Sequence, residues 1–213
     1  MTHLLFLPGA GGAAEFWHPL GQLLPDAWEK TYLNWPGLGH EPHAPGYDSL
    51  DALTQHAEKH LAPSGNVILA HSMGGIFAMR LALRHPQRIS RMVLTAASGG
   101  LDVARFGATD WRPEYRAEYP RAADWIMKAR ADHTPQIGDI RMPVLLLWGD
   151  ADSISPVSIG RHLQDLLPQA TLHVIKGGDH GFPRERAADI ASLVTDFIGT
   201  SQIQKGPQRM PRA

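Results

Sequence analysis

The stretch NVILAHSMGG, residues 66–75, decides the fold of this chain. Residues 66–70 form a short, mostly apolar run that is typical of a buried strand, and helical periodicity begins directly afterwards, over residues 73–85. A serine in such a tight strand-to-helix turn is held exposed, and its neighbours must be small for the two elements to approach. We therefore predict that Ser72 is a nucleophile and that Gly74 and Gly75 make room for it.

The same alternation of strand and helix patterns extends along the chain. The predicted strands cover residues 3–7, 30–33, 66–70, 91–96, 143–148 and 170–175. The predicted helices cover residues 48–62, 73–85, 157–167 and 184–198. This alternation indicates βαβ units, and strands rich in Val, Ile and Leu indicate burial on both faces. The sequence therefore predicts an α/β fold, with a parallel six-stranded sheet between two layers of helices.

One long segment interrupts the alternation of strand and helix patterns. We expect a single domain over residues 1–198 with a cap insertion at about 98–142, a segment that has no strand pattern. Loops of this length are uncommon unless they are functional. Its aromatic residues could pack the cap onto the body or line a substrate site, and we expect substrate contacts from Trp111 and Trp125. Residues 199–213 lack periodicity and are predicted to be unstructured.

Composition excludes several classes of function. Twenty basic and twenty-one acidic residues leave a net charge of -1, so no nucleic-acid or membrane partner is expected. The absence of cysteine excludes disulfides, thiolate zinc sites and a cysteine nucleophile, and it favours a cytoplasmic location. The apolar runs are strand-sized, and the first residues lack the pattern of a secretory signal. A small, largely uncharged substrate is expected.

A serine nucleophile needs a base, and His180 is the candidate. It lies in the sequence GGDHGF, residues 177–182, which follows the last predicted strand. Active sites of parallel sheets lie at the carboxyl ends of the strands, and histidine has a suitable pKa of about 6.5. An acid must orient the imidazole. Asp150 and Asp152 both follow the strand at 143–148, and position along the chain does not separate them.

The glycine-rich segment PGAGG, residues 8–12, is a candidate oxyanion loop. Acyl transfer requires two N–H donors for the oxyanion, and we expect them to be the backbone amides of Ala10 and Met73. The segment lacks the glycine and lysine patterns of nucleotide-binding loops. His56 and His60 are spaced like metal ligands, but the sequence between them is not that of the H-E-x-x-H motif. We therefore expect no cofactor and no metal.

The order of serine, acid and histidine along residues 3–198 resembles that of the α/β-hydrolase superfamily. In that family the acid stands three residues after the glycine that ends its strand, and a proline follows four residues later. Gly149, Asp152 and Pro156 match this spacing. The resemblance thus implies that Asp152, rather than Asp150, completes the triad.

Two motifs depart from the family pattern. The loop LPGAGG, residues 7–12, is similar to the family's His-Gly oxyanion loop, although Pro8 replaces the histidine. Ala70 stands where the usual G-x-S-x-G motif has its first glycine, a variant shared by some small bacterial lipases of the superfamily. The chain also starts just before this loop, so the resemblance implies a minimal, mostly parallel sheet with a short cap.

The resemblance also implies the chemistry. Residues 84–86 and 89–95 look like those of carboxylesterases, whereas residues 5–17 look like those of type II thioesterases. We expect hydrolysis of small carboxylic esters through an acyl-enzyme, with apolar acyl groups favoured. One alternative is an acyl thioesterase that acts on thioester substrates. The other is a catalytically silent scaffold that binds a small ligand or a partner.

Overall fold

A six-stranded sheet forms the centre of the protein, whose structure, a computed structural model, describes residues 1–200. The strands are β1 (His3–Leu7), β2 (Glu29–Tyr32), β3 (Asn66–His71), β4 (Ile89–Thr95), β5 (Val144–Gly149) and β6 (Ala170–Ile175). They lie in the order β2-β1-β3-β4-β5-β6, and all five pairings are parallel. The predicted α/β fold is confirmed. The predicted unstructured tail falls, beyond residue 200, outside the described residues.

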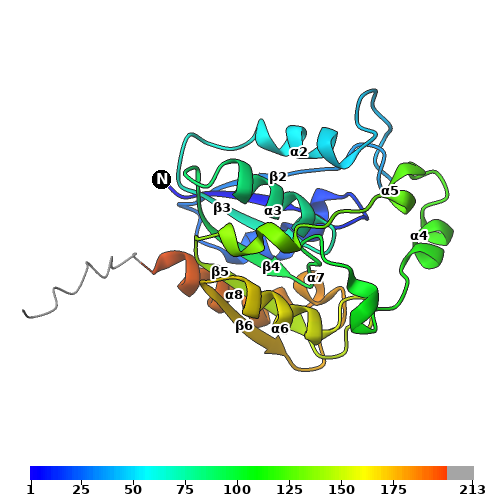
Figure 1. The fold of residues 1–213 in the computed structure, drawn as a ribbon. Coiled ribbons are helices and arrows are strands. Elements are labelled where there is room, and N and C mark those ends of the chain that lie inside the picture. The colour runs from blue at the N-terminus through cyan, green and yellow to red at the C-terminus, as the bar shows by residue number, and fades with distance from the viewer. Residues whose placement is uncertain (201–213) are drawn as a thin grey trace, which may run out of the picture.

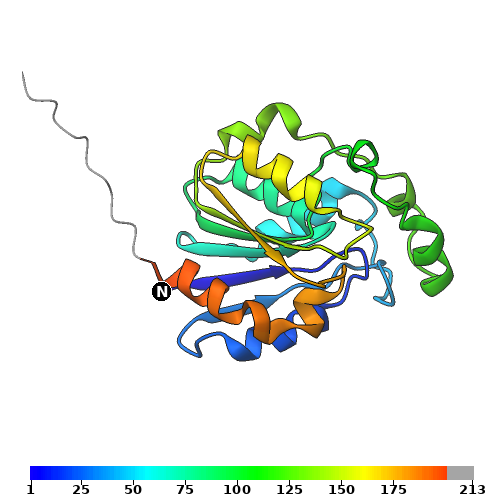
Figure 2. The ribbon, with the colours of Figure 1, turned by 90° about the horizontal axis from the view of Figure 1, so that it is seen from below.

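Helices cover both faces of the sheet (Figures 1 and 2). One face carries α2 (Leu50–Glu58), α3 (Gly74–Arg84) and α6 (Val157–Leu166), and the other carries α1 (His18–Leu23), α7 (Phe182–Glu185) and α8 (Ala187–Gly199). Alternate residues of each strand enter the two cores. Leu5 and Leu7 of β1 pack in the first core, and Leu4 and Phe6 pack in the second. The near-continuous apolar runs of the strands are explained by this two-sided burial.

Two helical regions differ from the sequence-based expectation. α1 was not expected, because it has only six residues and Gly21 is a poor residue for a helix interior. Pro19 lies in its first turn, where proline is compatible with a helix. Gly21 is required by packing, since a Cβ there would lie 1.9 Å from the hydroxyl of Tyr32. The helix expected at 184–198 is divided into α7 and α8 by Arg186, which has a non-helical backbone. At Gly21, packing thus overrides helix propensity.

Residues 112–128 of the segment 98–142 lie beyond the carboxyl ends of the strands (Figure 1), whereas residues 134–139 pack against α3. The segment contains η2 (Val103–Phe106), α4 (Arg112–Glu118), α5 (Trp125–Lys128) and η3 (Thr134–Asp139). We call this segment the cap. Along residues 1–200, no helix has the length and apolar character needed to cross a bilayer.

Gly74, the first residue of α3, lets this helix approach the end of β1. A Cβ at this position would lie 2.5 Å from the Leu7 carbonyl oxygen and 2.7 Å from that of Pro8. Backbone atoms at the end of a buried strand have little freedom to move aside. Gly74 therefore sets the distance between α3 and the loop that follows β1.

We predict that Gly74→Ala destabilises the protein, although alanine is the better helix former. Overpacking of a tight contact costs about 1–3 kcal/mol, which exceeds the gain in helix propensity. Chemical unfolding monitored by circular dichroism measures the change in the free energy of unfolding. Gly138→Ala is the matched control, because the nearest atom to a Cβ there is 4.0 Å away. Equal stability of the two variants would show that the contact at Gly74 is not tight.

Candidate active site

Ser72 occupies the turn between β3 and α3 with a φ of +51°, in the left-handed region that a non-glycine residue seldom adopts. The turn is fixed by hydrogen bonds from the Ser72 N–H to the Thr95 carbonyl (3.1 Å) and from the Gly75 N–H to the Ser72 carbonyl (3.0 Å). A Cβ on Gly75 would lie 2.5 Å from the Cβ of Ala97. The small residues noted in the sequence are thus required by close packing around a strained serine.

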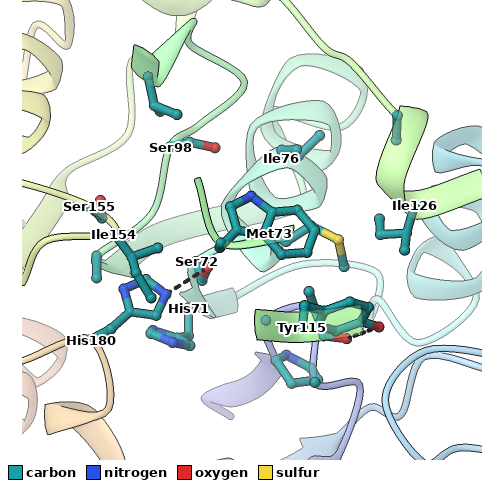
Figure 3. A pocket seen from close by; sticks show the side chains of 18 of the residues that line it. His71, Ser72, Met73, Ile76, Ser98, Tyr115, Ile126, Ile154, Ser155 and His180 are labelled. Carbon is teal, nitrogen blue, oxygen red and sulfur yellow. Dashed lines mark hydrogen bonds between the residues drawn. The ribbon is translucent and has the colours of Figure 1, made fainter. Parts of the chain in front are cut away.

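A chain of hydrogen bonds runs from Ser72 to a buried carboxylate (Figure 3 shows its first link). The Nε2 atom of His180 lies 3.0 Å from the Ser72 Oγ atom, and its Nδ1 atom lies 2.8 Å from Asp152 Oδ2. His180 follows β6, and Asp152 follows β5. Three segments that are distant in sequence therefore meet at the carboxyl edge of the sheet, as parallel-sheet topology favours.

Asp152 and Asp150 have different environments, which the sequence did not reveal. The Asp152 side chain is fully buried, and its Oδ1 atom accepts hydrogen bonds from the N–H groups of Ile154 (2.9 Å) and Ser155 (2.8 Å). Asp150 is exposed, and its carboxylate accepts from the N–H of Gly177 at 2.5 Å. Asp152 alone of the two contacts His180. Its backbone donors satisfy one oxygen and leave the other for the imidazole.

The loop after β1 lies against Ser72. A Cβ on Gly9 would lie 3.2 Å from the Cβ of Ser72, so a side chain there would crowd the serine. The backbone N–H groups of Ala10 and Met73 have no acceptor within the described residues. Met73 also directly precedes α3, whose N-terminal end favours negative charge. These two free donors are suited to an anion formed beside Ser72.

The sequence analysis did not identify His71 as part of the site. The only signal for it in the sequence is its position directly before Ser72. Its buried ring stacks on Phe16 at 4.3 Å and lies 4.8 Å from the His180 ring, measured between centroids. Burial lowers the pKa of His71 well below its ordinary value, and the nearby His180 lowers it further. The neutral form of the His71 ring is therefore favoured, so it adds no positive charge beside His180.

A cavity of about 910 Å³ opens above Ser72 (Figure 3). Its apolar wall includes Met73, Ile76, Leu101, Trp111, Tyr115 and Ile126. Charged residues that line it, such as Glu15, Glu118 and Arg184, are exposed to solvent. The cavity therefore offers an apolar interior with a charged entrance.

The two tryptophans expected to contact substrate lie in different places. Trp111 lines the cavity, but Trp125 is not among the lining residues and packs, partly buried, against the first core. Its neighbour Ile126 faces the cavity instead. The sequence could not separate the two tryptophans, because short cap helices give too little periodicity to assign a face.

No cluster of three or more potential metal ligands occurs among residues 1–200. The rings of His56 and His60 are neighbours, with centroids 5.2 Å apart. His56 also meets the rings of Trp35 and Tyr47, so its surroundings are aromatic. This environment differs from the polar ligand set of a metal centre.

Comparisons with known proteins agree with this architecture. The chain is similar to a pimeloyl-[acyl-carrier protein] methyl ester esterase of Neisseria meningitidis, with 25% identity over 89% of this chain and 91% of the relative. It is similar, at 22% identity over 90% of this chain and 84% of the relative, to a 2-hydroxy-6-oxo-6-phenylhexa-2,4-dienoate hydrolase of Burkholderia cepacia.

The fold also matches a solved esterase structure from Exiguobacterium antarcticum, with a TM-score of 0.76 at 14% identity, covering 94% of this chain and 92% of that one. The sequence model of the family described as alpha/beta hydrolase fold matches residues 2–125, which is more than half of the 213 residues. The chain therefore belongs to the α/β-hydrolase fold family.

Proposed function

We propose that this protein is a serine hydrolase that cleaves carboxylic esters through an acyl-enzyme and prefers apolar acyl groups. The observation that carries the proposal is the unbroken hydrogen-bonded chain from Asp152 through His180 to Ser72. It ends beneath a largely apolar cavity and beside two free backbone donors. The similarity to a methyl ester esterase supports an ester as the substrate.

In the first half of the reaction, the Ser72 Oγ atom attacks the ester carbonyl carbon and its proton passes to His180 Nε2. The carbonyl oxygen becomes an oxyanion, which accepts hydrogen bonds from the N–H groups of Ala10 and Met73. As the ester C–O bond breaks, His180 returns the proton to the leaving oxygen, and the alcohol departs. The acyl group remains bound to Ser72.

In the second half, water replaces the alcohol. His180 removes a proton from the water as its oxygen attacks the acyl carbon, and the same two N–H groups hold the second oxyanion. Collapse of this intermediate breaks the bond to Ser72, whose oxygen takes the proton back from His180. The carboxylic acid leaves, and the site is regenerated.

Asp152 supports both halves by holding the proton of His180 on Nδ1, so that Nε2 is free to act as the base. Its negative charge also stabilises the imidazolium that forms twice in each cycle. The neutral His71 ring complements this arrangement, because it adds no positive charge near His180.

We predict that Ser72→Ala abolishes hydrolysis of activated short-chain esters while the protein stays folded. Removal of the nucleophile of a serine protease costs on the order of 10⁶ in turnover. Intact mass spectrometry after treatment with a fluorophosphonate should detect one adduct on the wild type and none on Ser72→Ala. Ser98→Ala removes another cavity serine and should still be labelled. Wild-type turnover by folded Ser72→Ala would refute the assignment.

We predict that Asp152→Asn lowers kcat far more than Asp150→Asn. Asparagine preserves the shape of the side chain but can favour the wrong histidine tautomer, an effect of about 10⁴ in a serine protease. Asp150 is exposed and does not contact His180, so its variant is the matched control. Steady-state kinetics on one ester compares the two variants. The reverse ranking would identify Asp150 as the orienting acid.

We predict that kcat/KM rises with acyl length until the cavity is full, because each buried methylene contributes up to about 0.8 kcal/mol. Trp111→Ala should shift or flatten this profile, since Trp111 lines the cavity. Trp125→Ala should lower thermal stability and leave the profile unchanged. Matched series of esters and thioesters measure the profile and distinguish an esterase from a thioesterase. A flat wild-type profile would contradict the preference, and no turnover on either series would favour a silent scaffold.

A further inference from the structure

The hydroxyl of Tyr115, in helix α4 of the cap, joins two backbone segments of the body. It donates a hydrogen bond to the Ala10 carbonyl oxygen at 2.9 Å and accepts one from the Gly39 N–H at 2.9 Å. Tyr115 is buried, and its ring forms part of the cavity wall (Figure 3). A residue of the cap is thus bonded directly to the loop that carries one of the two free N–H donors.

Trp35 forms hydrogen bonds with the two ends of this loop. The Trp35 indole N–H donates to the Pro8 carbonyl at 2.8 Å, and the Trp35 backbone N–H donates to the Gly12 carbonyl at 2.8 Å. Within the loop, the Gly12 N–H donates to the Gly9 carbonyl at 3.1 Å. The Ala10 carbonyl, in the middle of the loop, is held by Tyr115.

The backbone around Gly39 leaves the loop of residues 8–12 little space for another conformation. Gly39 has a φ of +57°, and a Cβ there would lie 1.9 Å from the Gly11 carbonyl oxygen. The segment around Gly39 therefore lies directly against the oxyanion loop. Since the Tyr115 hydroxyl uses both its donor and an acceptor position between these segments, it fixes them relative to each other as well as to the cap.

We propose that Tyr115 is a positioning residue whose hydroxyl holds the Ala10–Gly11 peptide and thereby aims the Ala10 N–H at the oxyanion formed on Ser72. This inference rests on the proposed ester hydrolysis. Peptide planes are rigid and are joined by two soft dihedral angles at each residue, so anchoring one plane restricts the orientation of the adjacent one. The cap then contributes to the chemical step as well as to the binding of the acyl group.

This role has a specific kinetic consequence. The oxyanion exists only in the tetrahedral states, so misalignment of a donor lowers kcat and leaves KM nearly unchanged. Complete loss of one donor costs about 10²–10³ in kcat, and a displaced donor costs less. We therefore expect Tyr115→Phe, which keeps the ring and removes the hydroxyl, to lower kcat by about tenfold to a hundredfold.

The experiment compares Tyr115→Phe with Thr54→Val. Thr54 is buried outside the cavity, and its hydroxyl likewise donates to a backbone carbonyl, that of Leu50. Both variants lose one buried hydroxyl, so thermal unfolding should register a cost for each. Active-site titration corrects kcat for the folded fraction. Only Tyr115→Phe should lose kcat per site and bind a trifluoromethyl ketone, which forms an oxyanion on the serine, more weakly by the same factor as kcat/KM.

A second variant tests the hydrogen bond without removing the hydroxyl, and it covers the case in which Tyr115→Phe does not fold. Trifluorotyrosine at position 115 retains the ring and loses its hydroxyl proton at a much lower pH. A phenolate cannot donate to Ala10, so kcat should fall at alkaline pH where wild-type kcat does not. In the wild type, burial raises the pKa of Tyr115, the hydrogen bond from the Gly39 N–H and the charge of Arg116 oppose this shift, and Glu118 supports it.

The outcomes separate this inference from the function on which it rests. If the wild type hydrolyses esters and folded Tyr115→Phe has the same kcat, the role of Tyr115 is overturned and ester hydrolysis stands. The same holds if trifluorotyrosine at position 115 leaves the pH profile of kcat unaltered. An equal loss of kcat per site in Thr54→Val would also overturn it, because the effect would then follow from the loss of any buried hydroxyl. Absence of wild-type turnover on any ester would instead refute the proposed function.

Discussion

The close approach of α3 to the ends of β1 and β3 is the constraint on which the rest of the structure depends. It requires glycine at position 74, while the contact of α3 with Ala97, just after β4, requires glycine at position 75. Ser72 is held in the left-handed region of backbone space. The same approach places the serine beside the loop that follows β1. A strained turn of this kind persists only where the surroundings determine it fully, and here a buried sheet and a long helix do so. The packing of the sheet and α3 therefore offsets the energetic cost of the strained Ser72 backbone.

Loops around Ser72 supply the other functional groups of the site. His180 and Asp152 lie on loops after β6 and β5, and each is held by hydrogen bonds rather than by regular structure. The glycine-rich loop is held by Trp35 from the body and by Tyr115 from the cap. Loops carried by a rigid scaffold can vary in sequence while the geometry at the centre is maintained. This arrangement explains how one fold can serve many substrates.

Much of the fold could be predicted because buried parallel strands leave a strong sequence pattern, and the fully buried β1 has the predicted bounds. The positions of Ser72 and His180 relative to the strands also follow from the sequence. The direction of a side chain in a loop does not follow from the sequence. The residues alone therefore could not decide whether Asp150 or Asp152 contacts His180. The bond from Tyr115 to Ala10 joins positions 105 residues apart, and no local pattern encodes it. The sequence does not indicate α1, because the helix has only six residues and its Gly21 serves packing against Tyr32 rather than helix formation.

The distance along the chain between the interacting groups also affects how the protein folds. Ser72 and His180 are 108 residues apart, and three neighbouring strand pairs lie between β3 and β6. Parallel pairings of this kind close long loops before they gain stabilising contacts, so they form slowly. The hydrogen-bonded chain can exist only after the last strand has joined the sheet. Neither half of the polypeptide contains Ser72, Asp152 and His180 together. Formation of the hydrogen-bonded chain therefore indicates that the whole sheet has folded.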